Sequence, residues 1–427
     1  MATTTTNFGW DIPQSTDLVK DGATAIAALG QDIDTALVDL KGGTTGQVLA
    51  KASATDLDYS WVSPEVGDIT AVTAGTGITG GGTSGAVTVS FDQANFGGAQ
   101  GASGKNKAIN GACEIAQRGT AAVTLTAASF LYPIDRFFAG RSSGTSGATA
   151  QQFTSTGLDG FQYGVRIQRT AANTSTNDLY IGQSFETSNS IPLANKAVVV
   201  SFYARAGANY SPTSSALSVR FYTGTGTDQS GLGTAFTGST TAISQTATLT
   251  TSWQRFQYTA TLASTATQMQ FLVFASPTGT AGAADYFDIT GLQIELGAIA
   301  TPFSRSQGTI QGELAACQRY YYRLSSDGGY KTLAFGYASD TGTLQLGVPA
   351  VVTMRTTPTV FDSSATSTFY YEGGTAGSSP TSISLATRSL PTMGTLNIVK
   401  AASFVLGNGY SLLSNNTAAF IGFSAEL

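Results

Sequence analysis

The sequence predicts a mainly β protein: a short N-terminal helix, a glycine-rich β shaft, a β-sandwich and a smaller C-terminal β-sandwich. Three observations support this prediction. The chain has 427 residues, which is too long for one ordinary core. Hydrophobic residues make up 41% and charged residues 11%, with 50 glycines, a composition typical of β-rich and turn-rich proteins. Short strand-like segments recur beyond residue 160, separated by Gly, Ser and Thr loops and lacking long helical patterns.

Residues 1–16 are rich in threonine and polar overall, and the large apolar residues Phe8, Trp10 and Ile12 alternate along them. This stretch is too short and too polar to form a core of its own. It therefore predicts an extended arm whose apolar side chains dock onto another protein.

Residues 17–42 change to a helical pattern that ends at Gly42 and Gly43. The apolar stripe is too narrow for a monomeric domain, which favours a short coiled coil with copies of the same chain. The alternative is a single helix lying on a neighbouring protein. The stripe consists of Ile26, Leu29, Ile33, Leu37 and Leu40.

Residues 43–66 alternate turn residues with apolar ones and predict a small β collar, whereas residues 67–104 hold eleven glycines. Such a glycine-rich segment buries no core alone, but wound with two sister chains it forms a thin shaft. Gly75–Gly80 fits the dinucleotide-binding pattern G-x-G-x-x-G. That pattern requires a following helix, and the glycines after it exclude one, so we interpret it as shaft sequence.

Residues 105–305 carry the clearest series of strands, which predicts an antiparallel sandwich. At its end, the apolar parity shifts between Ile289 and Leu292, indicating a half-buried strand with a bulge at Gly291. Residues 306–323 form a connector with a short helical piece. Residues 324–427 repeat the strand pattern and predict a second, smaller sandwich at the tip, closed by a paired last strand.

Composition excludes several classes of function. A net charge of −5 without a basic cluster argues against a nucleic-acid partner. The longest apolar runs fall short of a membrane span, and the N-terminus lacks the pattern of a secretory signal, so we expect no membrane insertion and assembly in the cytoplasm of the producing cell. We expect no cofactor. Cys113 and Cys317 are interpreted as buried free thiols, with a disulfide as the alternative.

The absence of histidine removes Ser-His-Asp catalysis, Cys-His catalysis and the usual zinc sites. A glycosidase would need two carboxylates about 5 to 9.5 Å apart. Asp285 and Asp288 are three residues apart on a predicted strand and so face opposite sides. They are also weak candidates for a structural calcium ion, but the neighbouring sequence offers few further oxygen ligands, so we interpret them as solvated carboxylates.

Strand parity suggests one sugar-binding surface. In residues 198–205, Tyr203 and Arg205 point away from the apolar side, and Arg220 and Tyr222 do so in residues 217–222. If the two strands form a hairpin, the four side chains make a platform on which sugar rings stack. The alternative is that this face packs on a sister subunit. A second candidate surface at the tip contains Tyr370 and Tyr371 beside glycines.

Four segments resemble a set that recurs in bacteriophage tail fibres and related virion proteins. They are FGWDIPQSTDLVKDGATAIAALGQDID near the start, GTTGQVLAKASATDLDYSWVSP, NGACEIAQRGT with the later PIDRF, and LQIELGAIATPFSR followed by ELAACQRYYYR. The resemblance implies a jelly-roll domain like a carbohydrate-binding module that hands over to a C-terminal domain at about residue 323.

The resemblance also implies a function. We expect a parallel homotrimeric tail fibre located in the virion, whose N-terminal arm attaches to other virion proteins of the tail. Its distal domains would bind a host surface polysaccharide or receptor through weak sites that act together. The alternatives are a head fibre or capsid decoration protein, a polysaccharide-degrading tailspike enzyme, and a bacterial surface adhesin, which the missing export signal disfavours.

Overall fold

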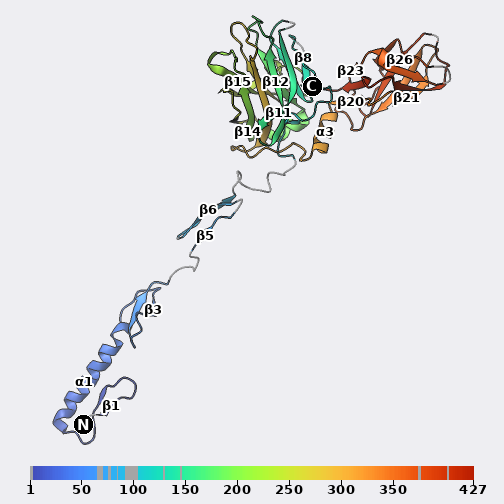
Figure 1. Ribbon diagram of the computed structural model, residues 1–427. Coiled ribbons are helices and arrows are strands. Elements are labelled where there is room, and N and C mark those ends of the chain that lie inside the picture. The colour runs from blue at the N-terminus through green and yellow to red at the C-terminus, as the bar shows by residue number, and fades with distance from the viewer. Residues whose placement is uncertain are drawn as a thin grey trace. The chain divides into compact units, whose positions relative to one another are not determined.

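Figure 1 shows a computed structural model of the chain. The structure describes residues 3–64, 71–75, 78–83, 85–91, 104–127, 130–144, 147–373, 377–401 and 403–427. The chain divides into two compact units, of which the first comprises Met1–Gly75 and Thr79–Ser90, and the second Thr76–Ile78 and Phe91–Leu427.

The first unit begins with a small hairpin, so the expectation of an extended arm was wrong. Strands β1 (Thr3–Thr4) and β2 (Asp11–Ile12) pair antiparallel. The turn between them needs a residue with positive φ, which Gly9 supplies at 69°. Phe8 stacks on Trp10 with ring centroids 4.9 Å apart, so these two aromatic side chains contact each other.

The predicted helix is present as α1 (Val19–Leu37), followed by the 3₁₀ turn η1 (Val38–Leu40). No residue of α1 is buried within this single chain. The apolar stripe is exposed, most of all Ile26 at 63%, while Leu29 is half-buried. None of the described helices is long and apolar enough to cross a membrane.

Two small sheets follow the helix along the chain. The predicted β collar is a hairpin of β3 (Val48–Lys51) and β4 (Tyr59–Val62). Within the predicted shaft, β5 (Val72–Thr73), β6 (Ile78–Gly82) and β7 (Val89–Phe91) form a three-stranded sheet in the order β5-β6-β7. Within the predicted shaft, residues 67–70, 76–77, 84 and 92–103 lie outside the described residues.

The main body of the second unit is an antiparallel β-sandwich of two six-stranded sheets, as the sequence predicts. One sheet has the order β16-β15-β18-β13-β10-β9, and the other has the order β17-β14-β19-β12-β11-β8. Alternate side chains of both sheets form one core, in which Phe202, Phe221 and Phe271 are fully buried. The strands are β8 (Val123–Thr124), β9 (Leu131–Ile134), β10 (Phe137–Arg141), β11 (Ala148–Leu158), β12 (Phe161–Arg169), β13 (Leu179–Phe185), β14 (Ala197–Ala206), β15 (Ala216–Gly224), β16 (Thr240–Thr248), β17 (Gln254–Thr261), β18 (Gln268–Ala275) and β19 (Tyr286–Leu296), with short helical turns α2 (Thr187–Ser190), η3 (Ile191–Leu193), η4 (Thr213–Ser215) and η5 (Gly233–Ala235).

Strand β19 contains the predicted bulge but is buried on both faces, so the half-buried expectation was wrong. Its register with β14 shifts between Ser201 and Tyr203, opposite Gly291, which has a φ of 64°. A segment from far earlier in the chain covers the second half of β19. The amide of Leu292 donates to the Gly111 carbonyl at 2.9 Å, and sequence periodicity gives no sign of this cover.

Helix α3 (Ile310–Gln318) leads into the tip, with the Thr309 hydroxyl capping its N-terminus at 3.1 Å from the Gly312 amide. The tip packs a three-stranded sheet, β20-β28-β23, and a six-stranded sheet, β24-β27-β21-β22-β26-β25, around their own apolar core. The last strand, β28, pairs on both sides, as predicted. The strands are β20 (Tyr321–Ser325), β21 (Thr332–Ala338), β22 (Thr343–Pro349), β23 (Val360–Ser363), β24 (Phe369–Glu372), β25 (Ser382–Leu385), β26 (Met393–Val399), β27 (Gly409–Ser414) and β28 (Phe420–Ser424), with the turn η6 (Thr366–Thr368).

Charged residues join the sandwich to the tip. Glu426 accepts hydrogen bonds from Arg118 and Arg136, and the guanidinium carbon of Arg136 lies 3.4 Å from the ring centroid of Tyr320. Cys113 and Cys317 are both buried and free, in agreement with the sequence interpretation.

Candidate functional site

The outer face of the sheet that contains β15 gathers aromatic and apolar side chains. Directly opposite residues in adjacent antiparallel strands point to the same face. The register places Phe274 opposite both Tyr180 and Ser218, and it places Leu272 opposite both Arg220 and Gly182. Residues from β15, β18 and β13 therefore meet on one surface.

These side chains border a cavity of about 610 Å³, which we call the aromatic hollow. Its floor comes from the sheet and one wall from the loop that follows β15. Its lining residues are Phe130, Arg141, Ser142, Asp178, Tyr180, Tyr222, Leu232, Thr234, Ala235, Leu272 and Phe274.

Two glycines let aromatic rings lie close to the sheet. A Cβ on Gly182 would lie 2.7 Å from Cζ of Phe138, and a Cβ on Gly140 would lie 2.7 Å from Cζ of Tyr180. Both distances are shorter than real Cβ contacts, and a Cβ on Gly182 would also meet the Phe271 carbonyl oxygen, so any larger residue would force these neighbours to shift. The shape of the floor therefore depends on glycine at these two strand positions.

Gln270 fixes the loop wall to the sheet. This glutamine is fully buried on β18, and its Nε2 donates to the Gly231 carbonyl at 2.7 Å and to Ser184 Oγ at 2.8 Å. Its Oε1 accepts from the Gly233 amide at 2.6 Å. The contacts with Gly231 and Gly233 hold the loop against the sheet, so Gln270 is a positioning residue for the hollow.

Two tyrosines offer hydroxyl groups at the hollow. Within the described part of the chain, neither the Tyr180 hydroxyl nor the Tyr222 hydroxyl makes a hydrogen bond, although both residues are buried. Burial raises the pKa of each phenol above its ordinary value, so both stay neutral at physiological pH. Each hydroxyl can therefore both donate to and accept from a ligand.

Arg141 adds a buried cation to the lining. Its Nη2 donates to Ser175 Oγ at 2.7 Å, whereas its Nε and Nη1 are buried without a partner among the residues that the structure describes. Burial, reinforced by the nearby Arg169, lowers the pKa of this guanidinium. Arginine remains charged in proteins, so the hollow is bordered by a cation whose hydrogen-bonding capacity is only partly used.

The four residues of the predicted platform lie on two different sheets. Tyr203 and Arg205 belong to β14, whereas Arg220 and Tyr222 belong to β15, and the two strands do not pair. The predicted hairpin was wrong because residues 207–215 cross from one sheet to the other. Tyr222 lines the hollow, and Arg220 lies beside it, with its guanidinium carbon 5.2 Å from the Phe274 ring centroid.

On the other sheet, Tyr203 packs against Phe161 at a centroid distance of 5.2 Å. The calcium candidates also lie on or next to this sheet, and both are buried and paired with arginine rather than solvated. Asp285 accepts from Arg169 at 2.8 Å, and Asp288 accepts from two arginines. The described residues contain no cluster of acidic, histidine or cysteine side chains suited to a metal ion.

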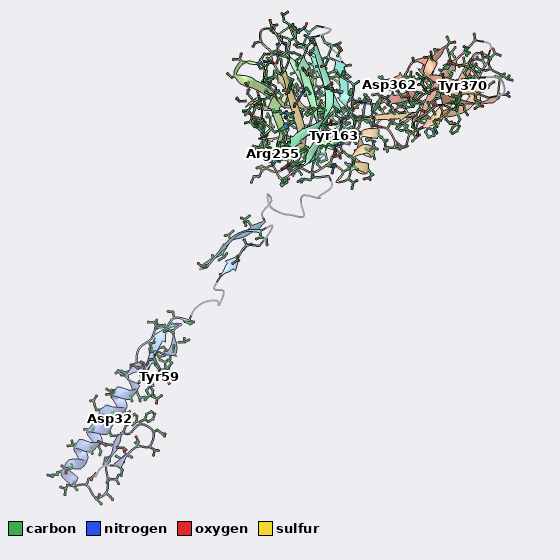
Figure 2. All side chains as sticks on the ribbon, viewed as in Figure 1. Asp32, Tyr59, Tyr163, Arg255, Asp362 and Tyr370 are labelled. Carbon is green, nitrogen blue, oxygen red and sulfur yellow. The ribbon has the colours of Figure 1, made fainter. Side chains whose placement is uncertain are left out.

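The two tyrosines at the tip have different environments. Tyr370, which is labelled in Figure 2, is half-buried. Its ring meets that of Tyr330 edge-on at a centroid distance of 5.7 Å. Tyr371 is only 2% exposed and packs against Phe404, so the expectation that it is exposed was wrong. Alternation along β24 turns it into the core of the tip. The neighbouring Gly374 lies outside the described residues.

Sequence reasoning missed most of the hollow, although part of its signal was available. In β18, Gln268, Gln270, Leu272 and Phe274 alternate with core residues, so their common face can be read from the sequence. The contributions of Tyr180, Phe130 and the loop wall depend on which strands are neighbours. Local sequence does not carry that information.

No protein-family model matches the chain, and no curated protein matches it. Similar solved structures include a carbohydrate-binding module of family CBM4, with 17% identity and a TM-score of 0.23, covering 35% of this chain and 87% of that one. The CBM22-1 xylan-binding domain of Paenibacillus barcinonensis Xyn10C shows 12% identity and a TM-score of 0.26, covering 46% and 98%. The enzymatically active domain of tailspike protein 4 from bacteriophage CBA120 shows 13% identity and a TM-score of 0.30. This last match covers 45% of the present chain and 22% of the tailspike chain.

Proposed function

We propose that this protein binds carbohydrate through the aromatic hollow. The observation that supports the proposal most directly is the combination of aromatic rings with unpaired polar groups in one cavity. Sugar rings present apolar faces that stack on aromatic side chains, and their hydroxyl groups need both donors and acceptors. Phe274, Tyr180 and Tyr222 offer the first kind of contact. The tyrosine hydroxyls, Arg141 and Asp178 offer the second.

The dimensions of the hollow agree with this proposal. Its volume of about 610 Å³ lies within the range of roughly 300–1,000 Å³ typical of small-molecule sites. Its floor is made of paired strands and its wall is held by Gln270, so little ordering is needed on binding.

We also propose that the protein binds its ligand without cleaving it. A glycosidase of the usual kind needs two carboxylates flanking the scissile bond. Asp178 is the one acidic residue among the described lining residues of the hollow. This composition supports recognition over hydrolysis.

We further propose that the chain works as a homotrimeric virion fibre of a bacteriophage tail. Four sequence segments support this role by their resemblance to tail fibres, and the exposed stripe on α1 supports association of copies. Burying that stripe in a coiled coil removes apolar surface from water. Ile33→Glu is expected to dissociate the trimer, and Gln31→Glu, which places the same charge opposite the stripe, is the control. Sedimentation that shows a monomeric wild-type chain at micromolar concentration would contradict the proposal.

Affinity electrophoresis of the full chain tests the carbohydrate proposal. The gels contain xylan, galactan, dextran or mixed-linkage β-glucan, and a retained polysaccharide identifies the ligand class. Ala235→Trp fills the hollow from an exposed wall position and is expected to abolish retention, while Ala208→Trp, on an exposed loop elsewhere, preserves it. Tyr222→Phe removes one neutral hydrogen bond and is expected to weaken binding by about two- to tenfold. Retention that survives Ala235→Trp would exclude the hollow as the site.

A further inference from the structure

The opposite sheet of the same sandwich carries a row of polar side chains in register. Arg166 on β12 lies directly opposite Gln151 on β11 and, on its other side, opposite Asp288 on β19. Asp288 in turn lies opposite Arg205 on β14. Because directly paired residues share a face, all four side chains point away from the core. We call these four residues the arginine row.

The arginine row holds more positive than negative charge. Asp288 is fully buried, and its Oδ1 accepts from Nε of Arg166 at 2.8 Å. Its Oδ2 accepts from Nη2 of Arg166 at 3.0 Å and from Nε of Arg205 at 2.9 Å. One carboxylate therefore serves two guanidinium groups, and one positive charge is left without a counterion within the row.

Part of each guanidinium faces outward. The side chains of Arg166 and Arg205 are 23% and 22% exposed. Within the described part of the chain, Nη1 of Arg166 and Nη2 of Arg205 donate no hydrogen bond. These N–H groups are unused donors on partly exposed side chains.

Aromatic rings hold the two guanidinium groups in place. The guanidinium carbon of Arg166 lies 3.6 Å from the ring centroid of Tyr286, and that of Arg205 lies 4.7 Å from the ring of Trp253. Phe153 lies near both, at 5.2 and 5.7 Å. The donors are thus ordered before any ligand arrives, which lowers the entropy lost on binding.

We propose that the arginine row binds an acidic sugar unit of a polysaccharide through its carboxylate or sulfate group. A planar guanidinium forms strong, directional hydrogen bonds with either group, and the half-buried rings of Phe153 and Trp253 offer a surface for the sugar ring. The net charge of −5 disfavours general adsorption of polyanions, so retention would require a local site. This second site is separate from the aromatic hollow and goes beyond the function proposed above.

Affinity electrophoresis of the full chain in gels containing polygalacturonate, dextran sulfate or neutral dextran tests this proposal. We expect retention by polygalacturonate or dextran sulfate that weakens as NaCl is added, because exposed charges are screened by salt. The polymer that retains the protein distinguishes a carboxylate ligand from a sulfate ligand.

Two variants remove the surplus charge in different ways. Arg205→Gln deletes one guanidinium, and Gln151→Glu places a carboxylate opposite Arg166 while leaving the buried pair intact. Both are expected to lower the affinity for the acidic polymer by at least about tenfold, because each removes about one charge-assisted hydrogen bond. Arg388→Gln removes the same charge from an exposed site on the tip and serves as the control.

The outcomes separate this proposal from the first. Loss of acidic-polymer binding in both row variants, with Ala235→Trp unaffected, supports the row as an independent site. If Gln151→Glu, which keeps the fold contacts of Asp288, retains full binding, the row is a purely structural ion-pair network. If neither acidic polymer retains the wild-type protein at low salt, the proposal is also overturned. Both of these results leave the proposed carbohydrate binding at the aromatic hollow unaffected.

Discussion

Replacing Arg169 by methionine is expected to destabilise the sandwich strongly. The Arg169 side chain is 2% exposed, and its Nη1 donates to Asp285 at 2.8 Å. Its Nη2 donates to the carbonyls of Asn173, Ser175 and Gly279 at 2.8 to 2.9 Å. One guanidinium therefore holds together the loop after β12 and the loop before β19.

The expected loss in free energy of unfolding follows from the polar groups that Arg169→Met leaves unpaired. Methionine fills a similar length but donates nothing, so a carboxylate and several carbonyls lose their partner. Breaking a buried ion pair from one side costs about 3–5 kcal/mol in free energy of unfolding. For a domain of this size the melting temperature falls by about 2–4 °C per kcal/mol, so we expect a drop of about 6–20 °C.

Thermal and urea denaturation, followed by circular dichroism, measure this change. Arg388→Met is the matched control, because Arg388 is exposed on the tip and its loss is expected to cost under about 0.5 kcal/mol. The same assay tests the calcium hypothesis: since Asp285 is already paired with Arg169, added Ca²⁺ is expected to leave the melting temperature unchanged. A cost below about 1 kcal/mol for Arg169→Met, or a clear rise in melting temperature with Ca²⁺, would refute this account of the site.

Three further predictions concern other buried groups. Burial raises the pKa of Asp135 from 3.8 to about 6 despite the nearby Arg118, so its protonated form favours the fold. That stabilisation is complete below about pH 3.8 and is lost as pH rises through 6. In urea titrations between pH 4 and pH 7, the free energy of unfolding of the wild type is therefore expected to fall by up to about 3 kcal/mol relative to that of Asp135→Asn. Burial raises the pKa of Cys113 to about 12 and that of Cys317 well above its ordinary value. A thiol reagent is therefore expected to label both cysteines only after unfolding, and rapid labelling of the native protein would contradict this prediction. Gly182→Ala is expected to cost about 1–3 kcal/mol in urea titrations because its Cβ would meet the Phe271 carbonyl oxygen and the Phe138 ring, and an unchanged midpoint would contradict this expectation.

Local patterns were sufficient to predict several of the individual elements, although strands β8 to β11 were missed. Helix α1 follows from a stripe with spacings of three and four, and the bulge at Gly291 follows from a parity change within a few residues. The burial of the second face of β19 could not be predicted in the same way. Its cover, which includes Gly111, comes from about 180 residues earlier in the sequence.

The candidate sites depend on which strands are neighbours, and local patterns do not predict this. Parity correctly indicated that Arg220 and Tyr222 point away from the core, but it could not identify β18 as the neighbour of β15. The interpretation of Asp288 as solvated failed for a similar reason. Its partners, Arg166 and Arg205, lie about 120 and 80 positions away and meet it only because β19 lies between β12 and β14.

The crossing of residues 207–215 from one sheet to the other separates the four residues of the predicted platform. It also explains why the sandwich has two chemically different outer faces. Because residues 207–215 pass from one sheet to the other, β14 and β15 contribute their apolar sides to one shared core and their polar sides to opposite surfaces. Side chains on the outer faces can then change without altering the packing of residues such as Phe202 and Phe221. Hydroxyl and aromatic groups gather on one face, and paired guanidinium groups on the other. Substitutions on the two outer faces lie well apart and share no partner, so their effects on binding should add.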